Sequence, residues 1–341
     1  MNSANSLLLK TLLPVAIGLG VVVWMFASEF NIDDWHRIPF TPHTLLAICA
    51  AWLFMGGREA GLAWRFRSLT DRDLSWRQAV KVTMLCEFTS AITPGTAGGS
   101  ALSMVFMKRE GITAGRGTTL MMCTLLLDEG FFVVACPLVF LLVPSSLMFG
   151  FDPGAVGSGI RLAFWIVYAI IVAWTLLLYA GIFLWPEKVC DMLTSLFRFR
   201  LLRRWSASIN EVAEGMLATS ASIRSRGCKW WGEAAVATTL SWVSRYMVVC
   251  ALFAAFVPAA SQLVVFGRQF VVWTLLTVSP TPGGSGVSEW LFTTYYGDLI
   301  GDASVALIIA ICWRIITYYV YLAVGAIMLP SFLKSSRKKH Q

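Results

Sequence analysis

The chain has 341 residues, of which 57% are hydrophobic and only 13% are charged, about half the charged fraction of an ordinary soluble domain. Its net charge of +8 does not indicate nucleic-acid binding. Of the 27 Lys and Arg residues, 21 fall in five segments that the topology below places on one side of a membrane. Composition therefore excludes a soluble enzyme and a nucleic-acid-binding domain, and it predicts an all-α integral membrane protein in contact with an anionic leaflet.

Histidine and cysteine offer little material for catalysis. The three His are His36, His43 and His340, and the eight Cys show no CxxC spacing and mostly lie in apolar runs. Small buried apolar residues are the plain interpretation of such Cys. We therefore expect no metal site, no disulfide and no cofactor.

The first apolar run, residues 7–27, is interpreted as a retained membrane span, with a cleaved signal peptide as the alternative. The connector 29–37 is acidic overall, which places the N-terminus inside. A second span, 44–64, then leads to a basic segment that begins at Arg65 and lies on the inside.

The next apolar stretch, 79–107, starts and ends at basic segments, so both of its ends lie inside. It is broken by a Pro/Gly segment, residues 93–100, which we call the first tip. Each arm has about 14 residues and would be about 21 Å long as a helix, too short for a hydrocarbon core of about 30 Å. The pattern predicts a re-entrant helical hairpin.

The middle of the chain crosses the membrane twice more and then stays inside. Residues 118–143 cross outward, 144–159 form an outside loop, and 162–185 cross back. The segment 186–229 carries eight Lys and Arg, and apolar residues recur at helical spacing from Val189 to Leu202. This pattern is typical of an amphipathic helix lying on the cytoplasmic membrane surface.

The last third repeats the earlier order of elements. Residues 230–257 cross outward, and the stretch 263–296 is broken by a second Pro/Gly segment, residues 279–286, which we call the second tip. An acidic connector follows, and 303–329 cross to a basic tail. We thus expect one transmembrane domain, 1–341, with six spans, two re-entrant hairpins, and cytoplasmic N- and C-termini.

The unit of span, broken hairpin and span occurs twice, as residues 44–143 and 230–329, and the second copy starts from the opposite side of the membrane. Charges fall at similar offsets from the two tips. Arg58 and Asp128 lie 36 residues before and 34 after Pro94, and Arg245 and Arg314 lie 37 before and 32 after Pro282. Such an inverted-topology repeat with broken helices is the architecture of secondary transporters.

The two tips are the first candidate binding elements. Several Gly together with Pro and Thr or Ser cannot stay helical, and the freed backbone N–H groups suit an anionic headgroup. Kinks in two ordinary helices are the alternative. The candidate substrate-binding residues here are Thr93, Pro94, Gly95, Gly98, Gly99, Pro280, Thr281, Pro282, Gly283, Gly284 and Gly286.

Charges inside the spans are the second candidate. Asp128, Glu129, Arg245 and Arg314 lie about 10 to 15 residues inside their spans, where a charge costs at least about 2.5–3.5 kcal/mol. We expect Asp128 and Arg314 to form a pair between the repeats, with either a structural role or a substrate or gating role. Glu87 and Glu289 flank the tips and are expected to order them. Arg268 lies near a span end and is expected to snorkel.

The chain resembles the flippase-like transmembrane domain of bacterial lysyl-phosphatidylglycerol synthases, a family with stand-alone members linked to polyprenyl-glycolipid, hopanoid and other lipid pathways. The resemblance rests on the segment from Pro280 to Glu289, on Trp313 to Tyr319 before Gly325, and on Leu126 to Glu129. The first tip departs from the family pattern, because Thr96 and Ser100 stand where members often carry charges.

The resemblance implies a flippase of the cytoplasmic (inner) membrane that moves an anionic or polyprenyl-phosphate-type lipid between leaflets, possible also as an oligomer. The headgroup would contact the tips, Arg245 and Arg314. The soluble aminoacyl-transfer domain of the synthases is absent from this sequence, so no enzyme activity is expected. Two alternatives stay open: a lipid-headgroup transferase with Asp128, Glu129 or Glu289 as base, and a small-anion transporter. A lateral opening would favour lipid, and a closed aqueous cavity a small solute.

Overall fold

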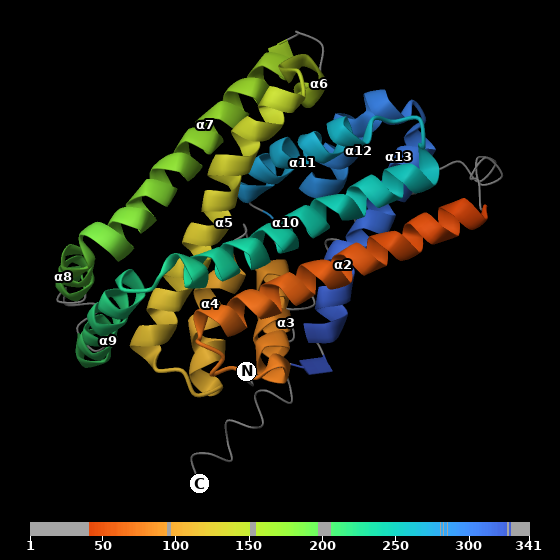
Figure 1. Cartoon of the computed structure of the whole chain (residues 1–341). Coiled ribbons are helices and arrows are strands. Elements are labelled where there is room, and N and C mark those ends of the chain that lie inside the picture. The colour runs from red at the N-terminus through yellow and green to blue at the C-terminus, as the bar shows by residue number, and fades with distance from the viewer. Residues whose placement is uncertain are drawn as a thin grey trace, which may run out of the picture.

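A computed structural model describes residues 41–93, 97–150, 155–196, 206–279, 281, 283, 284, 286–325, 327 and 328. Every regular element in these ranges is a helix (Figure 1). Five are long and apolar enough to cross a membrane: α2 (Pro42–Leu69), α5 (Ala114–Leu142), α7 (Ala155–Tyr179) with the π-segment η2 (Ala180–Leu184), α10 (Cys228–Phe256), and α13 (Ala303–Arg314) with the π-segment η4 (Ile315–Tyr319). They coincide with five of the six expected spans, and the first, 7–27, lies outside the described residues. The chain is thus a multi-pass all-α membrane protein.

Helix α2 is longer than the sequence predicts, and this places an extra charge in the protein interior. It begins with Pro42 after the N-cap Thr41, whose hydroxyl accepts a hydrogen bond from the Thr44 amide. It continues past the expected end at residue 64 to Leu69, after which Asp71 and Arg72 adopt left-handed backbone conformations. Arg65, expected in an inside loop, is therefore a buried helical residue.

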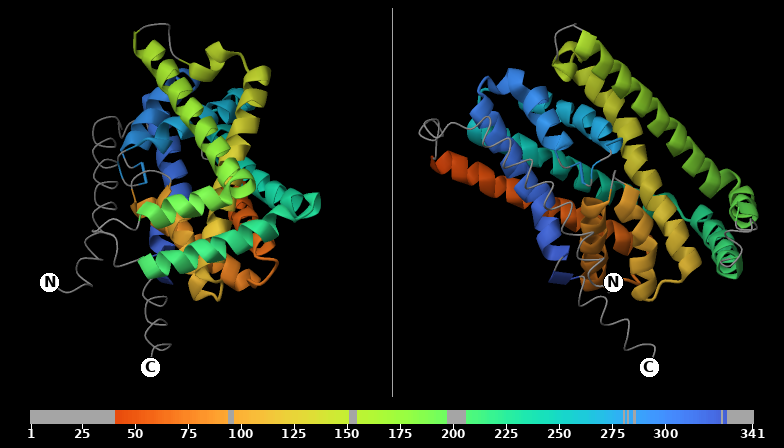
Figure 2. Two further views of the ribbon diagram at one scale, coloured as in Figure 1. Left: turned by 90° about the vertical axis from the view of Figure 1, so that its left-hand side faces the viewer. Right: turned by 180° about the vertical axis from the view of Figure 1, so that it is seen from behind.

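Helices α2 and α10 pack along each other at the centre of the molecule (Figures 1 and 2). Small residues allow the close approach. A Cβ atom at Gly61 would lie 2.8 Å from the Ala237 carbonyl oxygen, and one at Gly57 would lie 3.1 Å from Ser244 Oγ. Close packing through small residues is the usual way in which membrane helices associate, because lipid offers no hydrophobic driving force between them.

Each broken stretch forms two helices. The first gives α3 (Trp76–Ile92) and α4 (Ala97–Arg109), and the second gives α11 (Gln262–Thr277) and α12 (Val287–Ile300). The helices of each pair pack against each other. The α3–α4 pair lies at the lower end of the molecule in Figure 1, and the α11–α12 pair lies toward the upper end. The breaks separate the two helices of each stretch, as the sequence predicts.

The remaining helices are α6 (Ser145–Phe149), α8 (Pro186–Leu196) and α9 (Ser206–Arg224). Helices α8 and α9 pack against each other at the end of the molecule opposite α6 (Figure 1). Helix α8 falls in the predicted amphipathic connector 186–229. Residues 197–205 of that connector lie outside the described residues. Helix α7 exposes a row of large apolar side chains, as a lipid-facing helix does: Leu162, Trp165, Ile166, Ile170, Trp174 and Leu177.

The expectation that Arg268 snorkels is wrong. Its side chain is 1% exposed, and its guanidinium binds the Asp298 carboxylate, at 2.6 Å from Nη2. It also donates to the backbone carbonyls of Leu147, at 2.9 Å, and Tyr295, at 2.7 Å. The sequence shows only a charge near a span end. The packing of α11 against α6 and α12 supplies acceptors that satisfy the guanidinium inside the protein.

Candidate functional site

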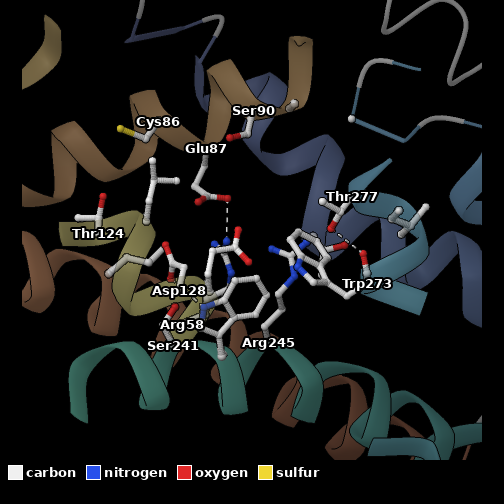
Figure 3. Close-up of a pocket in the computed structure, with 18 of the residues that line it drawn as sticks. Arg58, Cys86, Glu87, Ser90, Thr124, Asp128, Ser241, Arg245, Trp273 and Thr277 are labelled. Atoms are coloured by element: carbon white, nitrogen blue, oxygen red, sulfur yellow. Dashed lines mark hydrogen bonds and ion pairs between the residues drawn. The ribbon is translucent and has the colours of Figure 1, made fainter. Parts of the chain in front are cut away.

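A cavity of about 490 Å³ lies in the middle of the helices (Figure 3). Side chains from α2, α3, α5, α7, α10 and α11 line it, together with the second tip and residues of α13 and η4. Its charged lining residues are Arg58, Arg65, Glu87, Asp128, Glu129, Arg245 and Arg314. Charge in an apolar span is costly unless it is paired or faces water, so the partners of these groups decide what the cavity can bind.

The two tips meet beside this cavity. The Gly283 amide donates a hydrogen bond of 3.2 Å to the carbonyl oxygen of Thr93, the residue that ends α3. Gly283 has a φ of +56°, and a Cβ atom there would lie 2.2 Å from Tyr318 and 2.8 Å from the Ala91 carbonyl oxygen. This position therefore admits only glycine. Residues 190 positions apart in the sequence are thus in direct contact.

The second tip is held by Glu289 and Arg314. One Glu289 oxygen accepts hydrogen bonds of 2.8 Å from the Gly286 amide and from Ser288 Oγ, and the other accepts one of 2.8 Å from Arg314 Nε. Arg314 Nη2 also donates to the Gly283 carbonyl oxygen at 3.2 Å. Glu289 is 1% exposed and Arg314 is 5% exposed. The prediction that Glu289 orders this tip is confirmed.

The expected pair of Asp128 with Arg314 is wrong. Both residues line the cavity, but Arg314 pairs with Glu289, while Asp128 pairs with Arg65 and accepts a hydrogen bond of 2.8 Å from Trp242 Nε1. The prediction of this pair was wrong because the sequence-based topology assigned Arg65 to a loop. In the structure α2 continues past it, and Arg65 reaches Asp128 on α5 within the protein.

Arg58 is the centre of a second network. Its guanidinium donates to Glu59 at 2.5 Å, to Glu87 on α3 at 2.9 Å, and to the Tyr321 hydroxyl at 2.6 Å. Tyr321 in turn donates to Glu59. Figure 3 shows the Arg58–Glu87 contact crossing from α2 to α3. In the sequence Arg58 stood out only by its offset from the first tip, and Glu87 was expected to order that tip rather than to pair with Arg58.

Two charged side chains of the cavity differ from the others. In the part of the chain that the structure describes, neither Arg245 nor Glu129 has a hydrogen-bonding or ionic partner. The Arg245 guanidinium instead lies over the Trp273 ring, 4.3 Å from its centroid, and 5.9 Å from that of Trp242. An arginine over an aromatic face keeps its N–H donors free for an anion. Figure 3 shows Arg245 reaching from α10 toward Trp273.

The cavity also reaches the outer surface of the helix bundle. Ile170 and Trp174 of α7 line it, yet they are 60% and 45% exposed. Met121 and Leu125 of α5 extend the apolar lining beside them. One side of the cavity is therefore apolar and open toward the face that carries the row of apolar side chains on α7.

The structure brings six of the predicted site residues to the cavity lining: Asp128, Glu129, Arg245, Gly283, Gly284 and Arg314. Glu289 and Gly286 lie behind the second tip, and the Thr281 hydroxyl lies 3.1 Å from Ser279 Oγ. Gly98 and Gly99 belong to the first turn of α4. Pro94, Gly95, Pro280 and Pro282 lie outside the described residues.

The sequence-based site omitted several residues that line the cavity: Arg58, Arg65, Glu87, Trp242, Trp273 and Tyr321. One signal was available for two of them. Arg58 and Arg65 are seven residues apart, so on a continuous helix they project from nearly the same face. The Trp residues carried no such signal, because Trp is common at membrane interfaces.

Residues 11–325 match the family described as Lysylphosphatidylglycerol synthase TM region. The chain is also similar to a UPF0104 membrane protein of Archaeoglobus fulgidus. The two are 24% identical over 279 residues, which cover 79% of this chain and 80% of that protein. The match spans both tips and all five of the long apolar helices.

Proposed function

This chain belongs to the Lysylphosphatidylglycerol synthase TM region family, and on that premise we propose that it moves a phosphate-bearing lipid between the two leaflets of a membrane. The family is linked to lipid-related membrane function. A lipid joins a polar headgroup to apolar chains. The proposal therefore rests on the cavity, whose two ends differ in chemistry as the two ends of a lipid do.

Arg245 is the observation that carries the proposal. The other three cavity arginines have acidic partners, namely Glu59 and Glu87, Asp128, and Glu289. Arg245 has none within the described residues and keeps its guanidinium against the Trp273 ring. A permanently charged group held in an apolar span without a counter-ion is best explained by an anion that it binds part of the time. A phosphate group meets that requirement.

The apolar opening supports a lipid over a small anion. A headgroup at Arg245 would have an apolar exit beside Ile170 and Trp174, where acyl or prenyl chains can stay in the bilayer. A small hydrophilic anion gains nothing from such an opening. Two of the three candidate transferase bases are engaged: Glu289 with the Gly286 amide and Arg314, and Asp128 with Arg65. A transferase that used either of these two as its base would have to break an existing contact first.

The architecture proposed with this function has six spans and two re-entrant hairpins in an inverted-topology repeat. The helix order α2, α3, α4, α5 recurs as α10, α11, α12, α13. The two broken pairs lie toward opposite ends of the molecule, and their tips touch through Gly283 and Thr93 (Figure 1). Broken helices that meet at the middle of a repeat form the substrate sites of many secondary transporters. The basic-segment asymmetry supports an inner-membrane location with both termini in the cytoplasm.

The test measures lipid movement in liposomes that contain the full chain. We expect the protein to carry NBD-labelled phosphatidylglycerol between leaflets, measured by dithionite quenching, and Arg245→Ala to slow that movement about tenfold or more, as the loss of a charge-assisted contact implies. Arg77→Ala is the matched control, because Arg77 is exposed and lies outside the cavity.

Three results would contradict the proposal. Wild-type protein that moves no labelled lipid would remove the function. Equal rates for Arg245→Ala and Arg77→Ala would remove the role of Arg245. Strong inhibition by inorganic phosphate at concentrations that leave a neutral NBD-labelled glycolipid unaffected, together with uptake of radiolabelled phosphate, would favour the small-anion transporter. Melting curves of each variant separate a loss of transport from a loss of folding.

A further inference from the structure

We propose that Glu129 is a proton-binding site and that the protein moves one proton together with each anionic lipid headgroup. This inference rests on the proposed function and adds the source of energy to it. It comes from the second unpaired charge of the cavity, which the transport of an anion by Arg245 does not by itself require.

Glu129 differs from the acid beside it in the chain. Asp128 is compensated by Arg65 and by the indole N–H of Trp242. Glu129 lines the same cavity from the next position of α5, and the described residues give it no partner. A carboxyl group without a counter-charge in an apolar span is most stable when protonated, and it ionises when water or a cation reaches it. Glu129 is therefore placed to gain and lose a proton as the cavity changes its exposure.

Among the described residues, no cation of a neighbouring helix forms an ion pair with Glu129. The cations of α2 and α11 are engaged elsewhere, Arg65 with Asp128 and Arg268 with Asp298. Helix α7 lines the cavity with apolar side chains, and its Tyr168 hydroxyl donates to the Val133 carbonyl. The cavity also holds Arg58, Cys86, Glu87, Arg245, Arg314, Tyr318 and Tyr321. The described titratable side chains of helices packed on α5 further include Lys108, Arg109, Arg161, Tyr179, Glu214, Arg224, Cys228, Lys229, Glu233, Tyr246 and Cys250.

Tyr246 of α10 gives a second, independent observation. Its hydroxyl is buried and has no hydrogen-bond partner among the described residues. It lies within electrostatic reach of both Glu129 and Arg245. A buried hydroxyl is rarely left without a partner unless one arrives in another state. Tyr246 lies outside the cavity lining, and it is a buried polar group within reach of both unpaired charges.

The charge balance gives the direction of coupling. A monoanionic headgroup bound at Arg245 and a proton bound at Glu129 would cross together, so that no net charge moves. The proton enters from water on one side and is released to water on the other, and no bond of the lipid changes. A pH difference across the membrane would therefore drive the lipid toward the leaflet on the alkaline side.

The experiment measures the leaflet distribution of NBD-labelled phosphatidylglycerol in liposomes containing the full chain, with an imposed pH difference and the membrane potential held at zero by valinomycin and potassium. Wild-type protein should enrich the lipid on the alkaline side, up to about tenfold per pH unit for one proton per lipid. Reversing the pH difference should reverse the enrichment. Glu129→Gln should remove it, so that the lipid distributes equally at every pH difference.

Two further variants make the result specific. Glu187→Gln should keep the enrichment, because Glu187 is exposed on α8 and lies outside the cavity. Glu129→Asp retains a carboxyl group and should keep a pH response, which covers the case in which the amide variant folds poorly. An enrichment that persists in folded Glu129→Gln would refute the role of this residue.

The failures of the two proposals are distinguishable. Wild-type protein that equilibrates the lipid rapidly but ignores the pH difference would overturn proton coupling and leave lipid movement standing. Wild-type protein that moves no labelled lipid under any condition would overturn the proposed function and proton coupling with it.

Discussion

At the scale of single residues, the cavity is defined by which charges are compensated. Arg65 and Asp128 neutralise each other across α2 and α5, and Arg314 and Glu289 do so across α13 and α12. Among the described residues, Arg245 and Glu129 have no such partner. Membrane helices rarely carry a charge without function, so the uncompensated residues are the ones that the proposals use.

The Arg65–Asp128 pair makes a prediction about stability. Asp128→Asn or Arg65→Gln alone should lower the free energy of unfolding by up to about 3–5 kcal/mol, because each leaves a lone buried charge. The loss should stay toward the lower end of that range, because the Asp128 side chain is 19% exposed. The double variant should lose less than the sum of the two. Thermal melting in detergent measures all three, and strictly additive losses would show that the two charges do not depend on each other.

At the scale of elements, the contact of α2 with α10 organises the site. Arg58 and Arg65 project from α2, and Trp242 and Arg245 project from α10, so the spacing of these two helices sets the cavity. Gly57 and Gly61 allow the spacing, because Ser244 and the backbone at Ala237 occupy the volume that a side chain would need. The two helices come from different copies of the proposed repeat.

Two substitutions in α2 should act with opposite signs. A Cβ atom at Gly61 would lie 2.8 Å from the Ala237 carbonyl oxygen and 3.0 Å from the Ser241 amide nitrogen, both backbone atoms that cannot rotate away. Gly61→Ala should therefore destabilise the protein by about 1–3 kcal/mol.

A Cβ atom at Gly56, on the same helix, would have no neighbouring atom within 4 Å. Gly56→Ala should stabilise by about 0.5–1 kcal/mol through helix propensity alone. Melting temperatures that move in the same direction for both variants would contradict the packing argument.

At the scale of the whole molecule, the ends of the helix bundle should face opposite sides of the membrane. The short α6 and the start of α7 lie at one end, and the α8–α9 pair lies at the other (Figure 2). The basic residues of 186–229 predict that the second end lies in the cytoplasm.

Cysteine labelling checks this orientation. In a background with the exposed Cys49 and Cys228 replaced by Ser, a membrane-impermeant maleimide should label Ser158→Cys in intact cells. It should label Ser225→Cys only after the membrane is opened. Both positions are exposed. Labelling of Ser225→Cys from outside would invert the topology and contradict the cytoplasmic termini.

The sequence by itself determined the class of protein, the five described spans to within a few residues at most ends, and the two breaks. These features follow from local causes. The length of an apolar span depends on consecutive residues alone, and Pro and Gly interrupt a helix wherever they cluster. The family resemblance was equally local, since the segments from Pro280 to Glu289 and from Trp313 to Tyr319 carry it, and the match over residues 11–325 confirms it.

Only the tertiary structure decided which charged side chains form ion pairs. Asp128 and Arg314 lie at similar offsets from their tips, yet Asp128 forms an ion pair with Arg65, and Arg314 forms one with Glu289. Sequence offsets give the depth of a charge along its helix but not the direction in which that helix presents it. The end of α2 and the rotation of each helix about its axis are set by packing between helices far apart in the chain. For the same reason, only the structure shows that Arg245 and Glu129 have no ionic partner among the described residues.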